Sequence, residues 1–226
     1  MVSASDCIAI EIAYEPKWPE NWLADLVITW TPVTNKSERN RCETFVKEFE
    51  KAYSSDGLNR RLKKIVFLKE FSMSGQDFGG TYDPINGIIW STCNAQSKVN
   101  HVGTLHHEFS SLLFYNNKER FDIEKWESFN RRRDAYMYSE EERWYDPAKI
   151  KDTLSLELNP NLYNDGFIAN YNRVSLEEDI NVFAEYIYTQ PKKLTPIGKK
   201  YKRVHGKIEH LKNFYRQLGV ISQPAN

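Results

Sequence analysis

The chain has 226 residues, of which 40% are hydrophobic and 14% aromatic, so it can fold around a core of its own. Lys and Arg together number 31, as do Asp and Glu, and the formal net charge is therefore zero. A neutral chain has no long-range field that attracts a polyanion, and we expect no nucleic-acid partner. Since no run of about 18 apolar residues occurs, we also expect no membrane span.

The cysteines and the N-terminal residues do not fix the compartment. Cys7, Cys42 and Cys93 are odd in number and irregularly spaced, so at most one disulfide can form, and the paired spacing of a zinc knuckle is absent. Residues 1–15 lack the basic start and continuous apolar run of a secretory signal. Both a cytoplasmic location and export followed by loss of a signal stay open.

The first part of the chain alternates strand and helix patterns. Runs rich in β-forming residues predict strands at 7–15, 24–30 and 64–71. Apolar positions at helical spacing predict a helix over 43–53. The Asn86-Gly87 turn signal, followed by the run from Ile88 to Trp90, predicts a hairpin or an edge strand.

The second half of the chain is dominated by helical periodicity. Helices are predicted at 102–114, 122–137, 175–188 and about 195–218. No repeat or Gly/Ser linker divides the chain. We therefore expect one α+β domain over 1–226, with an α/β lobe and its mixed sheet at 1–116 and a helical lobe at 117–226.

The stretch TLHHEFSSLLF, residues 104–114, contains the most suggestive motif. On a helix, His107 and Ser111 share one face, and two residues at this spacing can present two ligands to a metal ion. Glu108 lies beside them and could take a proton from a metal-bound water. A zinc peptidase helix reads His-Glu-x-x-His, so Ser111 stands where a second histidine is expected.

The other histidines have simpler interpretations. His106 falls on the apolar stripe of the predicted helix, which favours a buried, hydrogen-bonded side chain over a metal ligand. His101 lies on neither face. His205 and His210 are five residues apart and point to different sides of their helix, so packing or surface roles are favoured over replacement of the missing ligand. A His-Glu pair alone also occurs by chance.

A second segment, residues 165–187, supplies further groups that a zinc hydrolase needs. Glu178 opens a predicted helix and could be a third ligand, and the hydroxyl of Tyr171 could stabilise an oxyanion. Glu178 also fits a capping box with Ser175, in which its carboxylate would bond to the backbone at the helix start. Both interpretations of Glu178 stay open.

In order and type, the two segments resemble the gluzincin-like metallopeptidases, in particular the anthrax lethal factor type and the zinc peptidases of bacteria. In that family a His-Glu-x-x-His helix is followed by a Tyr and then by a helix that carries Glu-Asp and Ala-Glu. The matching residues here are His107 and Glu108, then Tyr171, then Glu178-Asp179 and Ala184-Glu185. The resemblance spans about residues 80–190 and departs from the family at Ser111.

This resemblance implies a zincin-like fold whose edge strand, around Ile88–Trp90, holds an extended peptide or protein substrate. It implies zinc bound by His107 and Glu178, with Glu108 as general base and Tyr171 as oxyanion donor. Because a serine hydroxyl is a poor zinc ligand, two functions follow. One is a zinc-dependent metallopeptidase with an unusual ligand set. The other is a catalytically inactive zincin-like protein that binds peptides or acts as an interaction module. An accidental resemblance is the third possibility.

Overall fold

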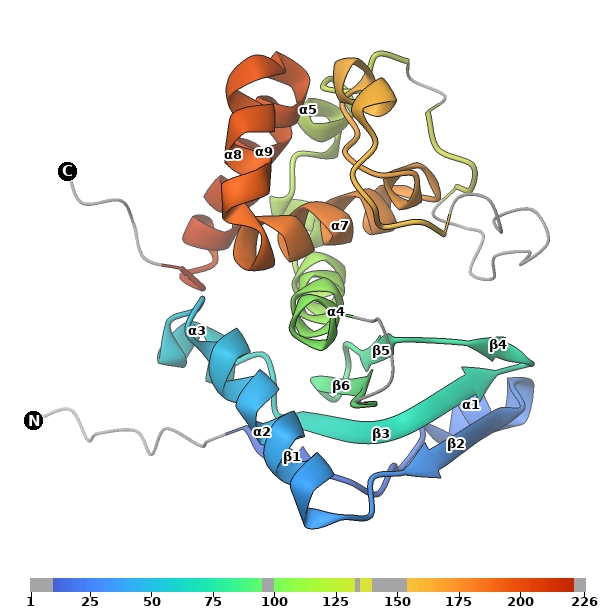
Figure 1. Cartoon of the computed structure of the whole chain (residues 1–226). Coiled ribbons are helices and arrows are strands. Elements are labelled where there is room, and N and C mark those ends of the chain that lie inside the picture. The colour runs from blue at the N-terminus through green and yellow to red at the C-terminus, as the bar shows by residue number, and fades with distance from the viewer. Residues whose placement is uncertain (1–9, 95–99, 133–134, 140–153, 222–226) are drawn as a thin grey trace, which may run out of the picture. The chain divides into compact units, whose positions relative to one another are not determined.

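The computed structural model describes residues 10–94, 100–132, 135–139 and 154–221 (Figure 1). The chain forms two compact units, one of Met1–Leu112 together with Leu218–Asn226 and the other of Leu113–Gln217. The division falls inside helix α4, which spans His101–Asn116.

A six-stranded mixed sheet lies in the first unit (Figure 1). Its main path runs β1 (Glu11–Ala13), β3 (Lys64–Met73), β6 (Ile88–Thr92) and β5 (Gly80–Asp83). The strands β1, β3 and β6 are parallel, and β5 is antiparallel to β6. Near its C-terminal end, β3 also pairs antiparallel with β2 (Ile28–Pro32) and β4 (Gln76–Asp77). The prediction of an α+β fold with a mixed sheet is confirmed.

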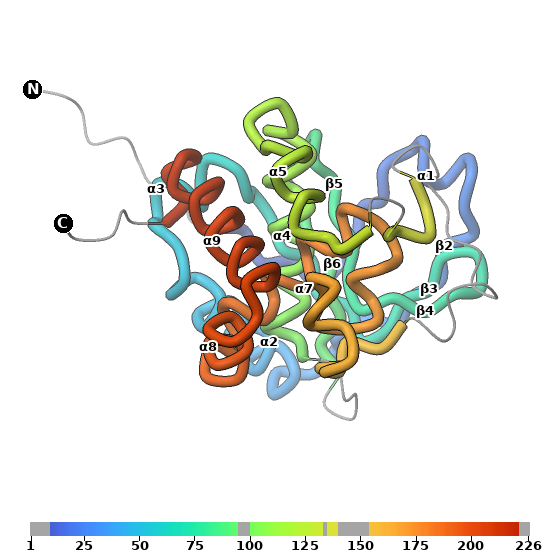
Figure 2. Tube along the Cα trace, turned by 90° about the horizontal axis from the view of Figure 1, so that it is seen from above, coloured from blue at the N-terminus to red at the C-terminus, as the bar shows by residue number. Residues whose placement is uncertain are grey.

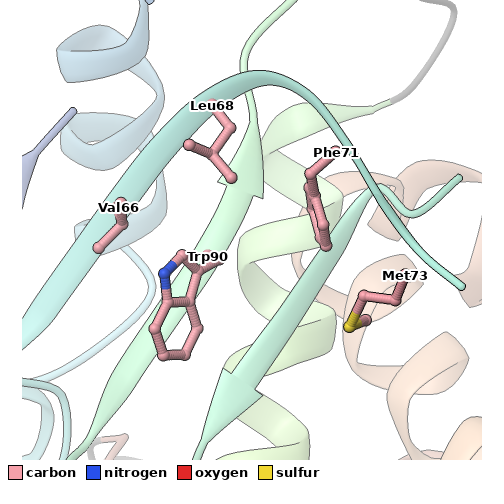
Figure 3. Close-up of a cluster of buried hydrophobic side chains, with 5 residues drawn as sticks. All are labelled: Val66, Leu68, Phe71, Met73 and Trp90. Carbon is pink, nitrogen blue, oxygen red and sulfur yellow. The ribbon is translucent and has the colours of Figure 1, made fainter. Parts of the chain in front are cut away.

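One apolar cluster of the sheet gathers Val66, Leu68, Phe71 and Met73 of β3 with Trp90 of β6 (Figure 3). Trp18 stacks on the ring of Trp90 with centroids 5.0 Å apart. The short helix α1 (Glu20–Asp25) carries Trp22, which packs on Trp90 as well, at 5.4 Å. Large aromatic rings therefore cover the β3–β6 pair.

Helices α2 (Lys36–Glu50) and α4 pack against each other through aromatic side chains. Phe49 of α2 meets Phe109 of α4 edge to face, with ring centroids 5.7 Å apart. A disulfide joins Cys42 of α2 to Cys93, the residue that follows β6, and both cysteines are fully buried. It ties α2 to the end of the strand that leads into α4.

The C-terminal residues of the first unit form hydrogen bonds with the residues that flank helix α3 (Ser55–Asn59). The Ser54 backbone N–H donates to the carbonyl of Val220 at 2.8 Å, and the Arg61 guanidinium donates to the carbonyl of Leu218 at 2.7 Å. These bonds hold residues 218–220 against residues 54–61, within the unit that contains the sheet.

The second unit is helical in its described residues (Figure 2). Its elements are the 3-10 turns η1 (Lys118–Arg120), η3 (Pro160–Asp165) and η4 (Tyr171–Arg173) and the helices α5 (Ile123–Glu127), α7 (Leu176–Thr189), α8 (Pro191–Lys200) and α9 (Lys202–Gln217). Trp126 of α5 lies in the core and meets Phe183 of α7 edge to face. None of the helices in the described parts of the chain has the length and apolar character needed to cross a membrane.

Three predicted elements of the N-terminal part need correction. Residues 24–30 do not form one strand, because α1 continues to Asp25 and β2 begins at Ile28. The strand at 88–92 forms the predicted hairpin with β5, but it lies between β3 and β5 and is not an edge strand. Of the predicted strand 7–15, residues 11–13 form β1, and residues 7–9 lie outside the described part.

Two predicted helices of the C-terminal part are also wrong in extent. The helix predicted at 122–137 ends at Glu127, and the Met137 and Tyr138 backbone N–H groups instead donate to the carbonyls of Arg173 and Val174. The helix predicted at 195–218 is two helices with extended backbone at Tyr201. The break lets α8 fold back on α9, so that a Cβ on Gly198 would lie 3.0 Å from Ile208 Cδ1. In one straight helix these residues would be about 15 Å apart along the axis.

Candidate functional site

Helix α4 begins at a side-chain cap, which fixes where His107 and Glu108 lie along it. The Asn100 side chain accepts a hydrogen bond of 3.0 Å from the backbone N–H of Gly103. Leu105, Phe109, Leu112 and Leu113 are fully buried, as the apolar stripe predicted. His107 and Ser111, four residues apart, therefore share one face of a well-anchored helix.

His106 is a core residue, as predicted. It is 2% exposed, and its Nδ1 forms a 2.7 Å hydrogen bond with the hydroxyl of Tyr53. Burial lowers the pKa of His106 from 6.5 to about 3, so the imidazole is neutral at physiological pH. His101 is likewise buried, and its Nε2 pairs with the carbonyl of Asn94 at 2.9 Å.

Glu108, the predicted general base, lies against strand β5. It is 8% exposed, and an ideal Cβ built on Gly80 would fall 2.7 Å from Glu108 Oε1 and 2.6 Å from Thr104 Cγ2. A larger residue at position 80 would force these two side chains of α4 to shift. The carboxylate therefore lies directly beside the backbone of β5. No sequence motif marks Gly80, although a glycine in a strand often indicates such a close approach.

Strand β5 ends the path of the sheet, and in the described residues it pairs with β6 on one side only. The Thr92 backbone N–H donates to the carbonyl of Gly79 at 2.8 Å, so these two residues form a hydrogen-bonded pair. Along an antiparallel ladder, hydrogen-bonded and non-hydrogen-bonded pairs alternate. By that alternation Thr81 and Asp83 bond to β6, while the backbone N–H and C=O groups of Gly80 and Tyr82 point to the other side. The outward backbone groups of Gly80 lie at the end of the sheet path, where another strand can be added.

Tyr171 and Glu178 are brought together in the second unit. The Tyr171 hydroxyl of η4 donates to Glu178 Oε1 of α7 at 2.9 Å, and the two residues are seven positions apart in the sequence. Ser175 is the N-cap of α7, and its side-chain oxygen accepts from the Glu178 backbone N–H at 3.2 Å. The serine half of the predicted capping box is present, and the Glu178 carboxylate bonds to Tyr171.

The donor set does not fit a catalytic zinc ion. Such sites use three protein ligands, and position 111 supplies a serine hydroxyl where an imidazole is needed. In residues 10–94, 100–132, 135–139 and 154–221, no three His, Cys, Asp or Glu side chains form a group that could hold a metal ion. His210 packs its ring on Phe121 and Trp126 in the second unit, and His205 is exposed on α9.

No protein-family model matches this sequence, and no curated protein matches it. One solved structure is similar, that of a "putative zinc-binding metallo-peptidase" from Bacteroides caccae ATCC 43185. The TM-score is 0.50 at 13% sequence identity, and the match covers 95% of this chain and 83% of that chain. The chain therefore has a fold similar to that of this Bacteroides protein.

Proposed function

We propose that this protein binds an extended peptide along strand β5, beside Glu108 of α4, on a metallopeptidase-type fold whose second histidine ligand has become Ser111. The position of Glu108 against Gly80 carries the proposal. An added strand would pair with the outward backbone groups of Gly80, which is how sheet edges bind peptides in other proteins.

Each unit carries polar groups that match the chemistry of a peptide backbone. A peptide presents N–H donors and C=O acceptors, and carboxylate acceptors are supplied by Glu108 in the first unit and by Glu178, which Tyr171 holds by a hydrogen bond, in the second. Hydrogen bonds to ionised groups are stronger than those between neutral groups. These side chains support binding without a metal ion.

Peptide hydrolysis is the second candidate function. It is favoured by the presence of Glu108, Tyr171 and Glu178 in the order found in zinc peptidases and by the hydrogen bond between Tyr171 and Glu178. In that function Glu108 would take a proton from the attacking water, and Tyr171 would donate to the oxyanion. The zinc ligand set, His107 and Glu178 with Ser111, weighs against it.

The experiment that tests both functions is affinity selection from a phage-displayed library of random linear peptides with the purified protein. Selected peptides are then incubated with the protein, with and without added zinc, and analysed by mass spectrometry. Enriched peptides that stay intact support the binding function. Cleavage that is abolished by Glu108→Gln would instead support hydrolysis, and a library without enrichment or cleavage would contradict both functions.

A further inference from the structure

The carboxylate of Asp179, the residue after Glu178, accepts hydrogen bonds from four side chains among the described residues of the second unit. Asp179 Oδ2 accepts from Trp126 Nε1 at 2.9 Å, from the Tyr136 hydroxyl at 2.8 Å and from Lys207 Nζ at 2.5 Å. Asp179 Oδ1 accepts from Asn172 Nδ2 at 2.9 Å. These donors come from different segments, so the carboxylate cannot turn without breaking several bonds.

The cation of this network is held as firmly as the carboxylate. Asp179 and Lys207 are both 0% exposed, and Lys207 Nζ lies 4.2 Å from the ring centroid of Phe167 and 5.2 Å from that of Trp126. A buried charge needs a partner of opposite sign, and aromatic faces add a cation–π contribution. The first turn of α7 is therefore fixed to α5 and α9.

Asn172 connects this fixed point to the turn that carries Tyr171. Its Oδ1 accepts from the backbone N–H groups of Ile168 and Ala169, at 3.2 and 2.8 Å, and its Nδ2 donates to Asp179. The side chain is fully buried. Two backbone donors on one side and a carboxylate on the other allow only one orientation of the amide.

Two hydrogen bonds thus join the same two elements one residue apart. Tyr171 bonds to Glu178, and Asn172 bonds to Asp179, each across seven residues from η4 to α7. We propose that the Asn172–Asp179 bond is the positioning contact that holds Tyr171 and Glu178 at hydrogen-bonding distance for peptide recognition. The role in recognition rests on the function proposed above, whereas the positioning itself does not.

The test replaces the chain's tyrosines with 3-fluorotyrosine and follows the ¹⁹F resonance of residue 171, assigned by its loss in Tyr171→Phe. Asn172→Ala is expected to move this resonance away from its wild-type position. Phe214→Leu, a core substitution on α9 where Phe214 packs on Phe121, is the matched control and is expected to leave it unchanged. If Asn172→Ala does not fold, Asn172→Ser replaces it in the test. The serine keeps an oxygen that can accept from the Ala169 N–H, but its side chain is too short to bond to Asp179.

The same variants are assayed with a peptide selected on the wild-type protein. Affinity is expected to fall by about 10- to 100-fold in Asn172→Ala, the range seen when an outer partner of a site is lost, and to stay near wild type in Phe214→Leu. An unchanged ¹⁹F resonance in Asn172→Ala would overturn the positioning role. If the wild-type protein binds no peptide, the proposed function fails while the resonance still decides the positioning.

Discussion

Gly80 and Glu108 are in such close contact that neither can be enlarged without moving the other: a Cβ at position 80 would fall 2.8 Å from Glu108 Cγ. The candidate base therefore occupies the space that a side chain on β5 would fill. This contact lies within the first unit and joins the strand at the end of the sheet path to helix α4.

A double-mutant cycle tests this contact. Gly80→Ala is expected to destabilise the protein by about 1–3 kcal/mol, the usual cost of overpacking. The cost should be smaller in the background of Glu108→Ala, which removes the carboxylate but leaves Thr104 in place. Urea unfolding of the four proteins gives the coupling free energy, which we expect at about 0.5–3 kcal/mol. Additive effects would show that Gly80 and Glu108 are not in contact.

The Cys42–Cys93 disulfide should be a major source of stability. The two cysteines are 51 residues apart in sequence, and closing a loop of that length in the unfolded chain is worth about 4 kcal/mol in the chain-entropy account. Reductant should therefore lower the free energy of unfolding of wild type and of Cys7→Ser alike. A thiol assay in denaturant without reductant should find one free thiol per chain, and a count of three would refute the disulfide.

Acid should destabilise the protein through His106. Its pKa is about 3 in the folded protein and 6.5 as the ordinary value, so between these pH values the unfolded chain binds the extra proton. The contribution of neutral His106 to the free energy of unfolding is fully present above pH 6.5. It falls by about 1.4 kcal/mol per pH unit as the pH drops toward 3.

His106→Asn is the control for this pH dependence, because its side chain can still bond to Tyr53 but does not titrate. From pH 7 to 4, wild type should lose about 3 kcal/mol more of its unfolding free energy than the variant does. Urea titrations at each pH provide the values. Parallel pH profiles for the two proteins would mean that His106 is protonated in the folded state.

Restoring the histidine at position 111 should restore zinc binding. A histidine there shares the face of α4 with His107, so Ser111→His should tighten zinc binding by at least about 100-fold, more than outer partners of zinc ligands contribute. Leu112→His is the control, since Leu112 is also buried but lies five residues from His107, on another face of the helix. Competition with a chromophoric chelator measures both affinities. Equal zinc affinity in the two variants would show that position 111 does not point at a preformed metal site.

The amphipathic and β-rich segments were predictable because their patterns are local. The apolar stripes locate α4 and α7, and the run of β-formers at 64–71 locates β3. The segment after Glu127 was not predictable, because its backbone bonds go to Arg173 and Val174, far away in the sequence. Periodicity cannot reveal such partners.

The candidate site was predictable only in part, for a similar reason. Sequence motifs indicate His107, Glu108, Tyr171 and Glu178, and the structure adds the bond between Tyr171 and Glu178. Lysine is almost always a surface residue, so nothing in the sequence marks Lys207 as fully buried against Asp179. Paired buried charges are found only once the fold brings them together.

Peptide binding along β5 is tested most directly by comparing Gly80→Pro with Gly80→Ala. Both variants add a Cβ beside Glu108, but only proline also removes the outward backbone N–H, and an edge strand tolerates proline where its N–H faces away from the sheet. The affinity of a selected, fluorescently labelled peptide is measured by anisotropy, with thermal unfolding to check the fold. We expect Gly80→Pro to bind about tenfold more weakly than Gly80→Ala, the effect of one lost hydrogen bond. Equal affinities in two folded variants would contradict binding at this edge.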